Sequence, residues 1–215
     1  MKSNSEYRAI ARQALEGRWT EGVVMTVILL LVACVCSVPQ VFCMGNFSYT
    51  QAVNGMQLVA CVLLLFPLQY GFCNTFLSML RNDSAEGNAL RDMWAFFKKD
   101  YSRSVPAMLL IGVLATLLAI VTLGIGAIIL GLAYAMVPYL LRDYPELTAR
   151  EALRTSREMM KGHKWDLFVL QLSFIGWILL AILTAGIGYL WLEPYIQMSV
   201  AAFYEDLKAE TIVEE

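Results

Sequence analysis

The feature that most constrains this chain is the length of its uncharged stretches. Three runs, residues 22–80, 104–141 and 167–204, contain no Asp, Glu, Lys or Arg apart from Glu193 in the third. A membrane-spanning helix needs about 20 apolar residues to cross a hydrocarbon core about 30 Å thick. The second and third runs each have 38 residues, and a single helix of that length would reach about 57 Å. Each run is therefore expected to fold back and cross twice.

Turn signals divide the runs into six segments. The second and third runs have paired glycines at their centres, 122–126 and 184–188, and the first contains a polar uncharged segment at 45–55; paired glycines interrupt helices. The predicted fold class is an all-α membrane protein with six transmembrane helices as three hairpins, each preceded by an amphipathic helix on the cytoplasmic face. The predicted spans are residues 23–42, 56–80, 104–121, 127–141, 167–183 and 189–204.

The charged residues predict the orientation. Only 16% of the 215 residues are charged and 59% are hydrophobic, whereas soluble domains are typically about 25% charged. All 16 Lys and Arg residues fall in the N-terminal arm, the connections after the second and fourth segments, and the C-terminal tail. Because Lys and Arg are enriched in cytoplasmic loops, both termini are predicted to be cytoplasmic.

An internal repeat is indicated by similarity between the two glycine turns. Residues 118–126 match residues 180–188 at seven of nine positions, 62 residues apart. The alternative is a chance match between apolar, glycine-rich stretches. We interpret residues 1–215 as a single membrane domain with pseudo-repeats at about 3–81, 86–143 and 148–207, and a disordered tail at 208–215. Such repeats favour a bundle with pseudo-symmetry about the membrane normal.

Three amphipathic helices are predicted on the cytoplasmic face, and their ends carry recognisable signals. Ser3 and Thr148 each precede a glutamate by three residues, the pattern of a capping box. Gly17 and Gly162 stand where glycine ends a helix. The three predicted surface helices are residues 5–16, 88–99 and 149–161.

The third surface helix has a basic face. Four basic residues recur at spacings of 4, 3 and 4, which places them on one side of a helix: Arg150, Arg154, Arg157 and Lys161. One interpretation is a surface that faces anionic lipid or a protein partner. The other is a solvated face that only enforces topology, since two glutamates dilute the positive charge.

Few ionisable or polar groups lie inside the predicted spans, and these are the candidate functional residues. Glu193, followed by Pro194, is the one carboxylate within a span; it is either a functional group or a carboxylate at the outer interface. Pro67, Gln69 and Asn74 in the second span either line a polar crevice or form hydrogen bonds between helices. No catalytic constellation, metal-ligand cluster or cofactor motif is found, and His163 is the only histidine.

The last third of the chain carries a recognisable pattern. It consists of residues 152–156, 160–162, 172–177 and 184–188, followed by Pro194-Tyr195 and Ala202-Phe-Tyr204. This pattern resembles a family of uncharacterised bacterial integral membrane proteins, known mainly from Firmicutes and catalogued as a domain of unknown function. The resemblance implies a location in the bacterial plasma membrane. It implies no activity, substrate or catalytic residue.

These observations lead to two hypotheses of function. The first is a non-enzymatic accessory, scaffold or assembly protein of the bacterial plasma membrane. Its expected partners are membrane lipid and either other proteins or further copies of the chain, and no nucleic acid or cofactor. The second is a small transporter or channel whose proline-bent helices line a path. A membrane enzyme is disfavoured because catalysis requires several convergent titratable groups.

Overall fold

A computed structural model describes residues 2–42, 57, 59–81, 89–99, 101–122 and 124–213, and every element in these ranges is a helix. The predicted loop at 45–55 lies outside the described residues, as do 82–88, where the second surface helix was predicted to begin, and the last two residues of the tail. Within the described ranges, five helices are long and apolar enough to cross a membrane. The sixth predicted span lies in α12 (Tyr189–Val213), which carries Glu193 near its start and several charged residues from Glu205 onward.

Three groups of consecutive helices, which we call hairpins one to three, make up most of the described structure. Hairpin one consists of α2 (Trp19–Phe42), which runs beside a π-helical turn, η1 (Cys61–Leu65), and α4 (Phe66–Leu80). Hairpin two consists of α6 (Tyr101–Thr122), α7 (Ile125–Tyr134) and α8 (Val137–Asp143). Hairpin three consists of α10 (Lys164–Leu172), α11 (Ile175–Leu183) and α12.

The glycine turns of hairpins two and three are built in the same way. The Thr122 hydroxyl accepts a hydrogen bond of 2.7 Å from the Gly126 amide, and the Thr184 hydroxyl accepts one of 2.9 Å from the Gly188 amide. Gly124 and Gly186 adopt positive φ angles of 93° and 87°, which residues with a side chain rarely adopt. The repeated sequence therefore forms a repeated turn at the predicted positions.

The predicted fourth and fifth spans are each divided in the structure. Hairpin two breaks between α7 and α8, where Pro138 stands at the first turn of α8 and has no amide hydrogen to continue the helix. Hairpin three breaks at Ser173, whose hydroxyl donates a hydrogen bond of 2.6 Å to the Leu170 carbonyl. Such local bonds compete with the regular helical ladder.

Three amphipathic helices each precede one hairpin in the chain: α1 (Asn4–Leu15), α5 (Ala89–Lys99) and α9 (Ala149–Met159). Both predicted capping boxes form, at Ser3 and Thr148, and Gly17 and Gly162 have positive φ angles after the helices end. The first and third helices therefore begin and end close to the predicted residues.

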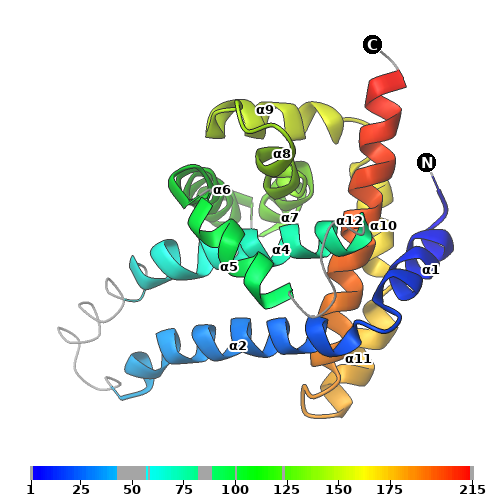
Figure 1. The fold of residues 1–215 in the computed structure, drawn as a ribbon. Coiled ribbons are helices and arrows are strands. Elements are labelled where there is room, and N and C mark those ends of the chain that lie inside the picture. The colour runs from blue at the N-terminus through cyan, green and yellow to red at the C-terminus, as the bar shows by residue number, and fades with distance from the viewer. Residues whose placement is uncertain are drawn as a thin grey trace.

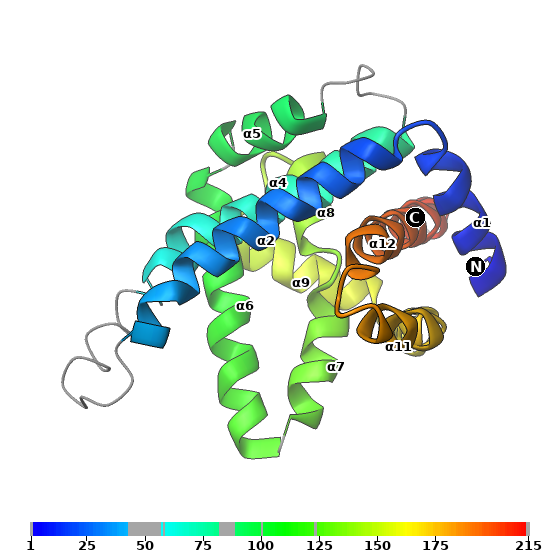
Figure 2. The same cartoon turned by 90° about the horizontal axis from the view of Figure 1, so that it is seen from below.

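The hairpins diverge from a shared base instead of lying side by side as the predicted bundle. In Figure 1, α2 runs across the view, α12 runs from bottom to top, and α6 is seen almost end-on. Figure 2 shows α6 and α7 along their length, with their connecting turn pointing away from α5. The hairpins share buried surface near the base, and many large apolar side chains elsewhere on the described helices are exposed.

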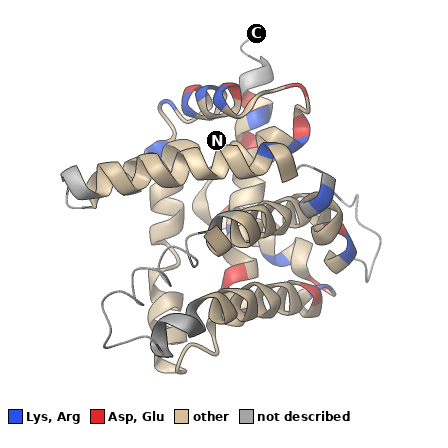
Figure 3. Cartoon of the chain, turned by 90° about the vertical axis from the view of Figure 1, so that its left-hand side faces the viewer, with Lys and Arg blue, Asp and Glu red and all other residues tan. Residues whose placement is uncertain are grey.

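The main core lies at this base, between α1, α4, α8 and α12. Its largest fully buried side chains are aromatic and come from all four helices: Tyr7, Phe72, Phe76, Tyr139, Phe203 and Tyr204. In Figure 3 the long helices are uncharged over most of their length, and the charged residues cluster on the surface helices and at helix ends. The core and the charged residues thus occupy the same part of the molecule.

The end of the chain differs from the predicted disordered tail. Helix α12 continues through this segment to Val213. Leu207 is buried, and the Lys208 ammonium lies 2.5 Å from the Asp143 carboxylate. These contacts hold the last turns of the helix against hairpin two.

Candidate functional site

A cluster of charged side chains, which we call the junction, joins the three hairpins at the base. The junction consists of Arg81, Asp143, Glu205 and Lys208. Arg81 donates two hydrogen bonds of 2.7 Å to Asp143 and lies 2.5 Å from Glu205 Oε1. Asp143 also accepts hydrogen bonds from Lys208 and from the Tyr204 hydroxyl, and its side chain is only 6% exposed. The end of each hairpin is thereby tied to the other two.

A second polar contact, the α1–α12 clasp, fixes the first surface helix. The Asp206 carboxylate lies 2.9 Å from the Lys2 ammonium and accepts a hydrogen bond of 2.6 Å from the Tyr7 hydroxyl. The Tyr7 ring packs on Phe203 with centroids 5.4 Å apart. Burial opposes ionisation of Asp206, but the hydrogen bonds from Lys2 and Tyr7 outweigh it and lower the pKa of Asp206 to about 2. Helix α1 therefore lies along α12 with its remaining faces available.

The structure connects two of the predicted site residues, Gln69 and Glu193, through a line of polar groups between α4 and α12. Gln197 donates a hydrogen bond of 2.9 Å to Glu193 Oε1 and accepts one of 3.6 Å from Cys73 Sγ. Gln69 in turn donates to Cys73 at 3.9 Å. Each of these side chains is hydrogen-bonded to the next, as is common where two membrane helices pack together.

The other predicted residues of the spans lie apart from this line. Asn74 donates to the carbonyls of Tyr70 and Pro138, at 3.0 and 3.2 Å, and so links α4 to α8. Pro67 has no amide hydrogen for the Leu63 carbonyl four residues earlier, and the Tyr101 hydroxyl donates to that carbonyl at 3.1 Å.

The last of these residues, Pro194, marks a close approach of two helices. A Cβ atom placed on Gly22 would lie 2.8 Å from Pro194 Cβ, so α2 and α12 pack closely here. The five predicted residues therefore mediate helix packing and do not gather in one place.

The basic face of α9 is divided between different roles. Arg154 pairs with Glu158 at 2.9 Å, with both side chains exposed. Arg157 hydrogen-bonds to the Tyr134 hydroxyl and lies over the Tyr134 ring, 5.4 Å from its centroid. Arg150 and Lys161 are exposed. The apolar face of α9 buries Ala152 and Leu153 against hairpin two, so this helix packs beneath the hairpin.

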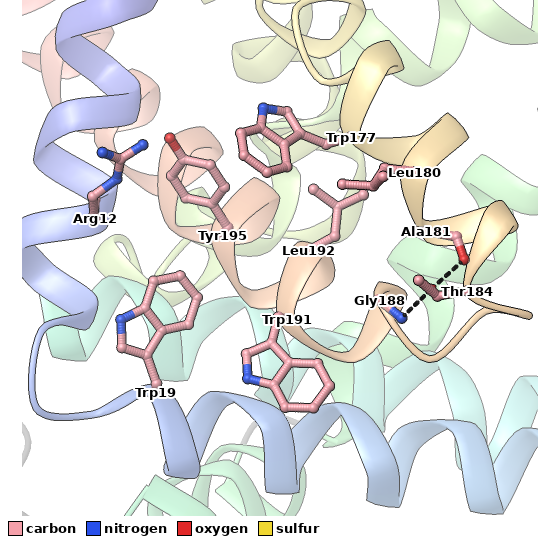
Figure 4. A pocket seen from close by; sticks show the side chains of 10 residues that line it. All are labelled: Arg12, Trp19, Trp177, Leu180, Ala181, Thr184, Gly188, Trp191, Leu192 and Tyr195. Carbon is pink, nitrogen blue, oxygen red and sulfur yellow. Dashed lines mark hydrogen bonds between the residues drawn. The ribbon is translucent and has the colours of Figure 1, made fainter.

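A groove between α1, α2, α11 and α12 is the most distinctive cavity among the described residues. Its volume is about 510 Å³, and Figure 4 shows Arg12 at one end and the Thr184–Gly188 turn at the other. The groove is lined mainly by aromatic and aliphatic side chains: Arg12, Trp19, Trp177, Leu180, Ala181, Thr184, Gly188, Trp191, Leu192 and Tyr195. Its surface suits a hydrocarbon chain better than a polar substrate.

Comparison with known proteins assigns the family. The family described as "Protein of unknown function (DUF975)" matches residues 100–211. The chain belongs to this family. No curated protein and no solved structure matches it. The DUF975 match contains hairpins two and three with α9, together with the region in which the sequence resemblance is strongest.

Sequence reasoning missed the junction, although a signal for it exists. Arg81 and Asp143 are 62 residues apart, and Arg81 and Glu205 are 124 apart. This spacing equals one and two periods of the repeat that relates the two glycine turns. The DUF975 match contains Asp143 and Glu205, whereas Arg81 precedes it. Placing charges at equivalent positions of the repeat would have indicated that they meet.

Proposed function

We propose that this DUF975 protein is a multi-pass protein of the bacterial plasma membrane whose three hairpins insert in the bilayer. The relation between apolar character and burial carries this proposal. The two candidate spans of highest mean hydropathy, Trp19–Cys36 and Lys164–Leu183, are 17% and 22% buried, whereas the span of lowest mean hydropathy, Leu63–Leu80, is 67% buried. In a water-soluble protein the most apolar helices would be the most buried. The reverse order is expected when lipid is the solvent of the outer helices.

The proposed topology has six crossings with both termini in the cytoplasm. The base carries the surface helices and the junction, and the two described turns, at Gly124 and Gly186, are uncharged. Positively charged segments remain on the cytoplasmic side during insertion. The base would then lie at the inner surface, with the hairpin turns directed into or across the bilayer.

Cysteine labelling tests this topology. In a variant whose five native cysteines are replaced by alanine, Ser48→Cys and Asn88→Cys form a matched pair on opposite sides of the proposed second span. A membrane-impermeant maleimide added to intact cells should label Ser48→Cys, and should label Asn88→Cys only after the cells are opened. Labelling of Asn88→Cys in intact cells would contradict the orientation.

Within the membrane we propose a non-enzymatic scaffold or accessory role. The intramembrane polar groups Gln69, Gln197 and Glu193 are engaged in hydrogen bonds to one another or to Cys73. The 510 Å³ groove is apolar and opens outward between hairpin three and α1. Such a surface suits lipid chains or the helix of a partner.

A pull-down and a flux assay separate this role from transport. The double variant Arg150→Glu/Arg154→Glu should lose a partner that the wild-type chain retains, because both side chains are exposed on α9. Purified protein in vesicles should show no flux of ions or small solutes above that of empty vesicles. Retention of every partner by the double variant would remove α9 from the proposed scaffold surface.

A transporter or channel is the second candidate, and the Glu193–Gln197 contact favours it. This contact places an ionisable group beside Pro194, where α12 lacks one backbone hydrogen bond. If the protein conducts a solute, Glu193→Gln should abolish its flux at normal expression, and Glu146→Gln, at an exposed position before α9, should not. Absence of flux in both the wild type and the variant would exclude this candidate.

A further inference from the structure

The groove has a charged extension formed by the outer face of α1. A second hollow of about 230 Å³ adjoins it and is lined by Ser5, Arg8, Ala9, Arg12, Trp177 and Tyr195. Three of these residues, Arg12, Trp177 and Tyr195, also line the groove, so the two hollows share a wall. The combined site therefore has an apolar part between α11 and α12 and a basic part beneath α1.

Arg8 and Arg12, which we call the rim arginines, have no anionic partner within the part of the chain that the structure describes. They are four residues apart on α1 and therefore lie on the same face. Among the described residues, the side chain of neither arginine forms an ion pair or a hydrogen bond. No Asp or Glu is among the residues that line the two hollows. By contrast, Arg81 and Lys2 are paired with carboxylates. The rim arginines thus present two unneutralised guanidinium groups above an apolar groove.

The groove provides a surface for hydrocarbon next to this charge. Trp19, Trp177 and Trp191 form its walls, and their rings are drawn toward the space between α1 and α11 in Figure 4. Gly188 immediately precedes α12 and Tyr195 lies about two turns into it, which corresponds to roughly 10 Å along the helix axis. An acyl chain lying along this path would contact aromatic and aliphatic groups while its headgroup stayed at the rim arginines. Trp and Tyr commonly occupy this boundary between headgroups and hydrocarbon.

We propose that this site binds an anionic phospholipid, with its phosphate between Arg8 and Arg12 and one acyl chain in the groove lined by Trp19, Trp177 and Trp191. Charge complementarity determines the class of ligand, because two arginines without a counter-ion select an anion and guanidinium groups bind phosphate oxygens in pairs. The inference rests on the proposed membrane location. Beyond the membrane location, it assigns specific binding of one class of lipid to one site on the protein.

Tryptophan quenching by brominated lipid tests this proposal. The chain has five tryptophans, and Trp94→Phe/Trp165→Phe leaves only the three that line the groove. This variant is reconstituted in phosphatidylcholine vesicles with increasing fractions of either phosphatidylglycerol or phosphatidylcholine brominated on its acyl chains. Quenching by the brominated phosphatidylglycerol should reach half its maximum at a lipid fraction roughly 25-fold lower than quenching by the brominated phosphatidylcholine, since each of the two arginines near anionic lipid contributes roughly a fivefold change.

Matched variants assign the preference to the rim arginines. Adding Arg8→Gln/Arg12→Gln should bring the two quenching curves together, whereas Arg150→Gln/Lys161→Gln on α9 removes the same charge elsewhere and should leave the preference intact. Equal curves for the two lipids in the parent variant would overturn the proposal. Loss of preference in the α9 control as well would also overturn it, because the effect would then follow net charge alone.

A complementary variant separates this proposal from the membrane location on which it rests. Trp19→Phe/Trp177→Phe/Trp191→Phe keeps Trp94 and Trp165, both exposed outside the groove. If neither set of tryptophans is quenched by either lipid, the membrane location fails. If only the outer tryptophans are quenched, the groove is covered by protein, such as a second copy of the chain, and the lipid site is contradicted.

Discussion

The junction and the rim both contain cationic side chains, but those of the junction are paired with carboxylates, whereas the rim arginines have no such partner among the described residues. Arg81 and Lys208 meet carboxylates from other hairpins within 2.7 Å, around an Asp143 side chain that is almost fully buried. The rim arginines face an apolar groove without a carboxylate. Charges that are paired and buried hold the hairpins together, whereas charges left unpaired beside an apolar surface are available to a ligand. This difference separates residues that maintain the fold from residues that are candidates for function.

The largest expected effect comes from breaking the junction. Asp143→Asn should lower the free energy of unfolding by about 3 kcal/mol, because it leaves Arg81 and Lys208 near each other without their shared counter-ion. Unfolding of the purified protein in mixed micelles with increasing dodecyl sulfate measures this loss. In a double-mutant cycle, Arg81→Met should cost much less when Asp143→Asn is already present. Additive losses would show that the two side chains do not act as a pair.

Packing near the base gives the next largest effect. A Cβ atom at Gly71 in α4 would lie 2.5 Å from the Met93 carbonyl oxygen of α5, whereas nothing lies within 4 Å of one at Gly176 in α11. Gly71→Ala should therefore lower the free energy of unfolding by about 2 kcal/mol. Gly176→Ala should leave it unchanged or raise it slightly, because alanine favours the helix. Equal effects in the same micelle titration would contradict the contrast between the buried helix and the exposed one.

The α1–α12 clasp is expected to have an effect on stability between those of the junction and the rim arginines, and its contribution to stability should depend on pH. The pKa of Asp206 is about 2 in the folded protein, compared with about 3.9 for an unperturbed aspartate. Its contribution to stability is therefore complete above about pH 4 and is lost as pH falls toward 2, with a magnitude on the order of 1 kcal/mol. Comparing wild type with Asp206→Asn between pH 2 and 6 measures it. The difference in stability should shrink on acidification; a constant difference would assign the effect to packing.

The rim arginines should give the smallest effect on stability. Arg8→Gln/Arg12→Gln should change the free energy of unfolding by less than about 0.5 kcal/mol, the usual range for surface substitutions away from paired groups. Lys2→Gln, just before the same helix but in the clasp, provides the control and should cost more. A large loss in the rim variant would mean that these arginines support the fold, and the comparison with the junction would fail.

The helices and their caps were predictable because they depend on neighbouring residues. The capping boxes at Ser3 and Thr148 and the turns at Gly124 and Gly186 follow from local patterns and occur at the predicted residues. Five of the six predicted spans overlap helices that are long and apolar enough to cross a membrane. The interruption at Pro138 was partly visible in the sequence, since proline begins a helix more readily than it continues one.

The candidate site was less predictable because it depends on contacts between distant segments. The groove requires α1 to lie along α12, and that follows from the Tyr7–Asp206 contact across 199 residues. The basic face of α9 looked uniform, but Arg157 lies on Tyr134 and Arg154 pairs with Glu158. Periodicity identifies which residues share a face, but not which of them find partners in the folded chain.

The spacing of the junction along the chain has a consequence for biosynthesis. Its first member, Arg81, emerges from the ribosome long before Glu205, which follows it by 124 residues, and before Lys208, which comes later still. Until then Arg81 and Asp143 can neutralise each other, but Lys208 is not yet available to Asp143 and Glu205 is not yet available to Arg81. A nascent chain that has not yet reached Glu205 has an incomplete junction, so the final assembly of the hairpins has to wait for the synthesis of this part of α12.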